Sequence, residues 1–205
     1  MSSFLDEEVP PVNPLGTSAL EELGRLFLEQ FAPETLTGPC PLNVIDLADT
    51  QLGKFGIHVS PASREELGNR AGATNPRGDT EIDILVAEGV WEQLESPPPQ
   101  CYYARSTVCH EVGHAIVHVP VLRRKLLVNE VFARVQRAKL KAFEDPEWQA
   151  WTFAGAILMP STTLRQLHVQ HGTLNPELVS SVYEVSTQMA ASHLRKLRWL
   201  NGAGK

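Results

Sequence analysis

The chain has 205 residues, of which 42% are hydrophobic and 20% are charged, and its formal net charge is −6. This length allows one domain with a sizeable core and a small appendage, and the composition excludes a chain that is disordered throughout. The negative charge argues against a protein that coats nucleic acid through its net charge. Three cysteines without a CxxC pair favour a reducing compartment, and no apolar run approaches the roughly 18 residues that cross a bilayer. We therefore expect a cytoplasmic protein without a membrane segment.

The first part of the chain predicts helices that lead into a small sheet. Residues 1–16 are expected to form a flexible leader, because three prolines prevent a helix there. An amphipathic helix then begins at Ser18, the expected N-cap, with Glu21 three residues later as in a capping box. The apolar stripe of this helix consists of Leu20, Leu23, Leu26, Phe27 and Phe31. Residues 42–53 predict a short second helix, and residues 55–60 predict a strand.

The middle of the chain predicts one further strand. Residues 61–80 are polar and rich in glycine, and we interpret them as a loop with room for a weak strand. Residues 81–87, with the sequence EIDILVA, alternate as expected for a strand with one buried face. We expect this strand to lie at an exposed edge of the sheet.

The second half of the chain predicts helices. They are expected at residues 104–118, 121–142, 146–159, 175–185 and 186–200. Pro120 should end the first of them, and Pro146 should occupy the first turn of the third. Seven basic residues between positions 123 and 141 are interpreted as a solvated helix face, with a contact to an acidic partner as the alternative.

The segment CHEVGHAIVH, residues 109–118, contains the motif H-E-x-x-H. On a helix, His110 and His114 lie one turn apart on the same face, so both imidazoles can bind one metal ion. Glu111 projects beside them, where its carboxylate can polarise a water molecule bound to the metal. The alternative is a structural helix whose histidines are satisfied core residues. We favour the metal site, with His110 and His114 as ligands and Glu111 as the base.

A catalytic zinc site needs a third protein ligand. His118 continues the spacing of His110 and His114, but three ligands in a line along one helix cannot close a tetrahedron. The carboxylates that follow provide four candidates, namely Glu130, Glu144, Asp145 and Glu147. Glu147 fits best, because it opens the apolar helix EWQAWTFAGAILM, where a carboxylate needs a cationic partner.

The combination of this H-E-x-x-H with a downstream E-x-x-A-x-x-F-A-x-x-x-L-M-P resembles the ImmA/IrrE family of zinc metallopeptidases. The second motif is formed by Glu147, Ala150, Phe153, Ala154, Leu158, Met159 and Pro160. Trp151 and Ala156 stand where the family commonly has Asn and Glu. The resemblance implies that the two motif histidines and Glu147 are zinc ligands and that Glu111 is the catalytic base.

The resemblance also implies a fold and a function. The expected fold is α+β, with a mostly helical zincin-like metallopeptidase core, a small edge-stranded sheet and a C-terminal helical pair that resembles a helix-turn-helix. We expect a flexible leader at residues 1–16, a zinc metallopeptidase domain at 17–170 and a C-terminal helical extension at 171–205 packed on it. The expected activity is cleavage of a helix-turn-helix repressor in mobile-element induction or a stress response, with Zn²⁺ as cofactor or Mn²⁺ as the activating metal.

Two other functions remain open from the sequence. The first is a DNA-binding regulator, in which Arg195, Lys196 and Arg198 of the C-terminal helices would contact phosphates. We prefer packing of this pair on the peptidase core, and direct DNA binding is not expected. The second is a zinc-stabilised interaction module without turnover, although Glu111 is needed only for hydrolysis. A second electrophile for the oxyanion is open among Tyr102, Tyr103, His118, His168 and His171, and no oligomeric state is predicted.

Overall fold

The chain forms a mostly helical α+β fold in a computed structural model that describes residues 8–9, 12–127 and 135–199. The helices are α1 (Thr17–Phe31), α2 (Val44–Asp46), α3 (Arg64–Leu67), α4 (Glu88–Trp91), α5 (Tyr102–Gly113), α6 (Val119–Leu127), α7 (Pro146–Leu158), α8 (Ser161–His171), α9 (Pro176–Tyr183) and α10 (Thr187–Lys196). The strands are β1 (Glu8–Val9), β2 (Ile57–Ala62), β3 (Gly72–Arg77), β4 (Glu81–Ala87) and β5 (Val135–Gln136). The predicted α+β, mostly helical fold class is confirmed.

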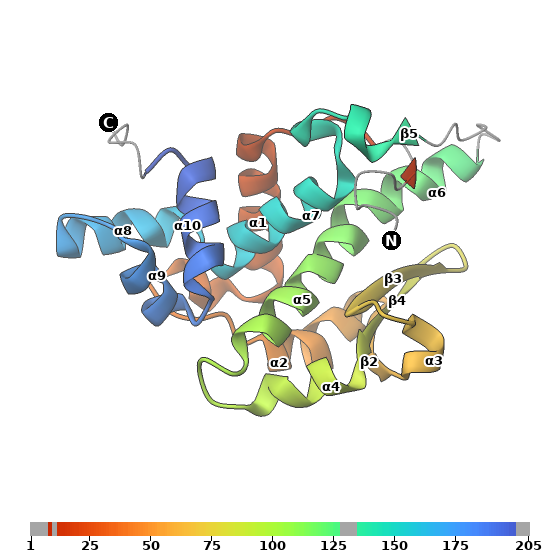
Figure 1. Cartoon of the computed structure of the whole chain (residues 1–205), viewed down its shortest axis with the longest axis horizontal. Coiled ribbons are helices and arrows are strands. Elements are labelled where there is room, and N and C mark those ends of the chain that lie inside the picture. The colour runs from red at the N-terminus through yellow and green to blue at the C-terminus, as the bar shows by residue number, and fades with distance from the viewer. Residues whose placement is uncertain (1–7, 10–11, 128–134, 200–205) are drawn as a thin grey trace.

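Helices α5 and α7 cross at the centre of the fold, and the three-stranded sheet and α8–α10 lie at opposite ends of it (Figure 1). Helix α1 packs on α7, where the Phe27 and Phe153 rings meet edge to face with their centroids 5.6 Å apart. One apolar core contains buried residues from nearly every layer, including Leu28, Ile84, Val108, Phe153 and Leu194. Within the described part of the chain, every helix is too short or too polar to cross a membrane.

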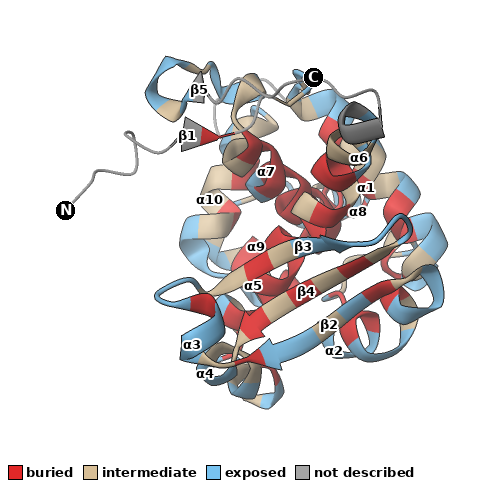
Figure 2. Cartoon of the chain, turned by 90° about the vertical axis from the view of Figure 1, so that its right-hand side faces the viewer, coloured by how far each residue is buried: buried red, intermediate tan, exposed pale blue. Residues whose placement is uncertain are grey.

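The three-stranded sheet has the order β2-β4-β3. Strand β4 pairs in parallel with β2 and antiparallel with β3, and Ile82, Ile84 and Val86 are buried in the core as predicted. Figure 2 shows buried and less buried residues alternating along β4. The prediction that this strand lies at an edge is wrong. Residues 61–80, expected as a loop with room for a weak strand, contain α3 and the strand β3. Strand β3 pairs with the side of β4 that was expected to be free.

The helix that contains the H-E-x-x-H motif does not end at Pro120. A π turn over His114–His118 follows α5, and α6 continues from it. The Val119 N–H donates to the carbonyl of His114, five residues back instead of four. This wider turn accommodates Pro120, which has no N–H to donate and would clash with the carbonyl four residues earlier in a regular helix.

Helix α1 begins at Thr17, after Gly16, and the expected N-cap at Ser18 is wrong. Ser18 lies inside the first turn, so Glu21 has no capping role and turns inward. Its side chain is only 12% exposed. Burial raises the pKa of Glu21 to about 7, against the opposing effects of hydrogen bonds from Ser161 and the charge of Lys196.

Part of the expected leader makes defined contacts with the body. Strand β1 pairs with β5, the Leu15 N–H donates to the carbonyl of Phe143, and the carbonyl of Asn13 accepts from Gln149. Figure 2 shows β1 beside β5 above the sheet. The region expected as one helix at 121–142 contains instead the end of α6, β5 and short 3-10 turns, with residues 128–134 outside the described ranges.

Two residues of the basic segment hold it to the body, so a purely solvated face is not observed. The Arg123 guanidinium donates to the carbonyl of Glu81, and Arg137 forms an ion pair with Asp145 at 3.0 Å. Helices α9 and α10 share the apolar core with α5 and α7, through residues such as Leu194. The domain boundary at residue 170 stays a prediction.

Two leucines of α1 test the register of this helix. Leu28 is fully buried, whereas Leu26, placed on the apolar stripe from the sequence, is 47% exposed. Leu28→Ala should lower the free energy of unfolding by about 2–5 kcal/mol, because it removes buried methyl groups and leaves a cavity. Leu26→Ala should change it by less than about 1 kcal/mol. Urea denaturation of both variants provides the measurement. Equal losses of unfolding free energy would contradict the assignment of the buried face of α1.

Glu21 should make stability depend on pH. Its folded pKa of about 7 lies above the usual value of 4.5, so the folded state resists ionisation. The free energy of unfolding should therefore fall as the pH rises from about 4.5 to 7. Glu21→Gln should be more stable than the wild type at pH 8, by about 3 kcal/mol, and similar to it at pH 4.5. The exposed neighbour variant Glu22→Gln should show no such gain, and parallel pH profiles for all three proteins would refute the assignment.

Candidate metal centre

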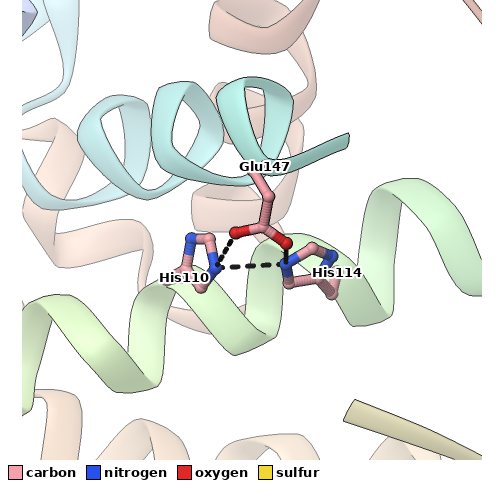
Figure 3. A group of neighbouring side chains, drawn as sticks. All are labelled: His110, His114 and Glu147. Carbon is pink, nitrogen blue, oxygen red and sulfur yellow. Dashed lines mark hydrogen bonds and ion pairs between the residues drawn. The ribbon is translucent and has the colours of Figure 1, made fainter. Parts of the chain in front are cut away.

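Three side chains from two helices converge where α5 crosses α7. His110 lies in the last turn of α5, His114 begins the π turn, and Glu147 lies in the first turn of α7. Helix α7 begins there because Asp145 accepts a hydrogen bond from the Glu147 N–H at 3.0 Å and Pro146 occupies the first helical position. Figure 3 shows the Glu147 carboxylate facing both imidazoles.

The three potential ligand atoms have the spacing that one metal ion requires. Nε2 of His110 and Nε2 of His114 are 3.1 Å apart, and each lies 3.2 Å from an oxygen of Glu147. Around a tetrahedral zinc ion with bonds of about 2.0 Å, ligand atoms are roughly 3.3 Å apart. Two imidazoles and one carboxylate, with a fourth position left for water, form a donor set of catalytic zinc sites. The cluster therefore fits a metal ion.

The electrostatics of Glu147 favour a cation at this point. Burial alone would raise the pKa of Glu147, but its contacts with the His110 and His114 rings lower it well below its usual range. The carboxylate is therefore ionised at neutral pH. A metal ion bound beside it would stabilise the same ionised form.

Gly113 allows the two helices to approach closely enough for these contacts. A Cβ at this position would lie 2.9 Å from the carbonyl oxygen of Ala150 and 3.0 Å from its Cα, closer than real Cβ atoms approach. Gly113 directly precedes His114 on α5, and Ala150 lies one turn after Glu147 on α7. The missing side chain is therefore what brings the carboxylate onto the two rings.

The edge strand β3 positions Glu111. The Thr74 hydroxyl lies 2.7 Å from Oε2 of Glu111 and 2.9 Å from its carbonyl oxygen, so it can donate to either. A Cβ at Gly72 would lie 2.7 Å from Cγ of Glu111. Glycine at this position is therefore required for the carboxylate to lie against the strand.

A chain of hydrogen-bonded, buried side chains lies behind His114. Its Nδ1 is 3.0 Å from Nδ1 of His118, and Nε2 of His118 is 3.0 Å from Oε1 of Gln149. His118 and Gln149 are 4% and 0% exposed. Burial, together with the neighbouring His114 ring, lowers the pKa of His118 to about 4, against the hydrogen bond to Gln149. His118 is therefore neutral at physiological pH.

The metal cluster opens into a cleft of about 860 Å³. One wall is formed by residues 69–76, which include most of β3, and the other by Tyr103 and Trp151. The Trp151 ring, which is 40% exposed, stacks on His110 with ring centroids 4.2 Å apart. Val9 and Val12 of the leader also line the cleft.

The structure distinguishes among the four carboxylates that were candidates for the third ligand. Glu147 joins His110 and His114 as the sequence predicts, and Glu111 lines the same cleft. Glu144 accepts from a backbone N–H instead, and Asp145 caps α7 and pairs with Arg137. Glu130 lies outside the described residues. The roles of ligand and base stay predictions.

The structure also distinguishes among the candidates for the second electrophile, the group that would stabilise the oxyanion. Tyr103 lines the cleft beside the cluster, and His118 lies behind His114 and is bonded to Gln149. His168 lies on α8 against Trp199, with ring centroids 5.3 Å apart. Tyr103 is thus the candidate with an open position in the cleft.

Sequence reasoning missed four residues that support the site, namely Gly72, Thr74, Gln149 and Trp151. Gly72 and Thr74 lie in a strand with weak strand propensity, so no pattern indicated that they face Glu111. Gln149 and Trp151 offered a signal, because they lie two and four residues after Glu147 on the same helix. Only the crossing of α5 and α7 shows which of these faces turns toward the histidines.

One comparison with known proteins finds a family. Residues 102–195, from the start of α5 into the last turn of α10, match the family model described as the IrrE N-terminal-like domain, a peptidase family. The match therefore includes the three clustered side chains and Glu111. A search of curated proteins finds no match.

The close contact at Gly113 predicts that a methyl group there disturbs the cluster. Gly113→Ala should push α7 away from α5, lower the free energy of unfolding by about 1–3 kcal/mol and weaken zinc binding. Gly89→Ala is the matched control, because a Cβ at Gly89 meets nothing within 4 Å. Zinc titration against a competing chelator, with urea denaturation of the metal-free proteins, measures both effects. Unchanged zinc affinity in the Gly113 variant would contradict the proposed role of the helix contact.

Proposed function

We propose that the chain is a zinc-dependent endopeptidase that cleaves a helix-turn-helix repressor. The match of residues 102–195 to the IrrE N-terminal-like domain family supports a metallopeptidase. One observation carries the activity. The two imidazoles and Glu147 have the spacing of a tetrahedral zinc site, and Glu111 lines the same cleft without belonging to the cluster. A purely structural zinc site would have no use for that second carboxylate.

In this proposal His110, His114 and Glu147 hold the ion, and Glu111 handles the protons. When bound, zinc polarises the scissile carbonyl and makes a water molecule more acidic. Glu111 accepts a proton from the water, whose oxygen bonds to the carbonyl carbon. The same carboxyl then gives that proton to the amine nitrogen as the C–N bond breaks. Thr74 keeps the Glu111 side chain in place through its hydroxyl.

The substrate should bind as an added strand on β3 and not on β4. Strand β4 is paired on both sides, whereas β3 lines the cleft and, among the described strands, pairs with β4 alone. An extended peptide can therefore form main-chain hydrogen bonds with β3 and pass the metal cluster. Pro76 has no N–H, so this pairing should lie toward the Gly72 end of the strand.

The repressor as substrate is supported by the resemblance to the ImmA/IrrE family, and release of silenced genes would follow from its cleavage. The rival function of a DNA-binding regulator receives less support. Lys196, one of the three basic residues available to phosphates, donates a hydrogen bond to Thr152 at 2.8 Å and lies over the Trp148 ring. Helix α10 therefore packs on α7 through a residue that DNA contact would need.

Carboxylate variants test the activity. Glu111→Gln should keep zinc but slow cleavage of the repressor encoded beside the gene by about 10²- to 10⁴-fold, because the proton acceptor is lost. Glu147→Ala should lower the zinc content, because a ligand is lost. Glu177→Gln, at an exposed position of α9, should behave as the wild type. Fragment formation and metal analysis of the purified proteins provide the measurements.

Two results would each contradict part of the proposal. Wild-type protein that takes up no divalent metal would refute the metallopeptidase activity of this site. Wild-type protein that binds both zinc and the repressor without cutting it would favour the zinc-stabilised interaction module.

A further inference from the structure

The hydrogen-bond chain behind His114 determines which of its ring nitrogens carries the proton. The chain runs from His114 through His118 to Gln149. The Gln149 amide nitrogen lies 2.9 Å from the carbonyl oxygen of Asn13 and 2.7 Å from that of Phe143. The five residues come from the π turn after α5, from α7 and the turn before it, and from the leader.

The amide of Gln149 has only one satisfactory orientation. Backbone carbonyls only accept, so the amide nitrogen must face Asn13 and Phe143 and use both its hydrogens there. The amide oxygen therefore faces His118. The opposite orientation would place that oxygen against two carbonyl oxygens in a buried site, which is unfavourable.

The proton positions then follow in order along the chain. Because the Gln149 oxygen only accepts, Nε2 of His118 must donate to it. In neutral His118 the other nitrogen, Nδ1, carries a lone pair, so it accepts from Nδ1 of His114. Neutral His114 consequently has no proton on Nε2, the nitrogen that faces His110 and Glu147.

We propose, on the basis of the function proposed above, that His118 and Gln149 are positioning residues that hold His114 in the tautomer that binds the metal. A histidine ligand must present a lone pair, and its other ring nitrogen commonly donates to a buried acceptor that fixes its orientation. The lone pair of His114 and the Glu147 carboxylate then face each other 3.2 Å apart, so a cation between them would be bound by both.

The two histidine ligands are held differently. Among the described residues, Nδ1 of His110 is buried and has no hydrogen-bond partner. The His110 ring is held by stacking on Trp151 instead. The hydrogen-bond chain therefore orients His114 and not His110. When it is lost, no second chain at His110 should compensate.

Zinc affinity tests the proposal independently of cleavage. Gln149→Met keeps the side-chain length but removes the amide, and His118→Phe keeps a ring but removes the acceptor. Each should weaken zinc binding by about 10- to 100-fold, the usual effect of losing such a partner. Gln170→Met, at an exposed position of α8, is the control and should match the wild type. Chelator competition on metal-free protein measures each dissociation constant.

A spectroscopic measurement on the wild type guards against variants that fail to fold. In metal-free protein at pH 8, the ring ¹⁵N signals should place the proton of His114 on Nδ1 and that of His118 on Nε2. A proton on Nε2 of His114, or unchanged zinc affinity in folded Gln149→Met, would overturn the proposal. If instead the tautomers are as expected but the repressor is not cleaved, the positioning role stands and the peptidase function fails.

Discussion

The close approach of α5 and α7 at Gly113 is the contact on which the site depends. His110 and His114 lie three residues before and one residue after this glycine, and Glu147 lies three residues before Ala150, the residue it touches. A helical period of 3.6 residues places all three on the facing surfaces of the two helices. The contact between the small residues thus sets both the distance between the helices and the distance between carboxylate and imidazoles. Helix α1 packs on the other side of α7 through apolar contacts, so α7 has little freedom to move away from α5.

The parts of the site that the sequence predicts are those controlled by helical spacing. His110 and His114 are four residues apart, and the choice of Glu147 over Glu144 and Asp145 used the apolar helix that follows it. Local chemistry explains why the rejected acids lie elsewhere, since an Asp directly before Pro at a helix start serves as an N-cap. The stripe of α1 was less well predicted. Leu26 and Leu28 are both apolar, and only the contact of Gly24 with Ala156 of α7 shows which face turns inward.

Features that depend on partners distant in sequence could not be predicted in the same way. The segment GATNPR of β3 contains Gly, Asn and Pro, which disfavour strands, and it becomes a strand because β4 pairs with it. The edge strand beside the cleft is therefore β3, and not β4 as expected. The prediction that Pro120 ends the helix failed for a related reason. A π turn removes the clash that a proline creates in a regular helix.

The leader shows most clearly why sequence patterns miss part of a site. Its prolines indicate a segment without helix, and the described residues 12–16 contain none. The contribution of Asn13 to the site, however, comes from its backbone carbonyl. A backbone carbonyl is present at every position, so no residue type marks the one that orients Gln149. Phe143 contributes in the same way, through a carbonyl that also accepts from the Leu15 N–H. The leader and the segment before α7 are thus bonded to each other and to the residue behind the metal cluster. Changes of side chain at Asn13 or Phe143 would leave these bonds intact, whereas a shift of either backbone would release the amide of Gln149.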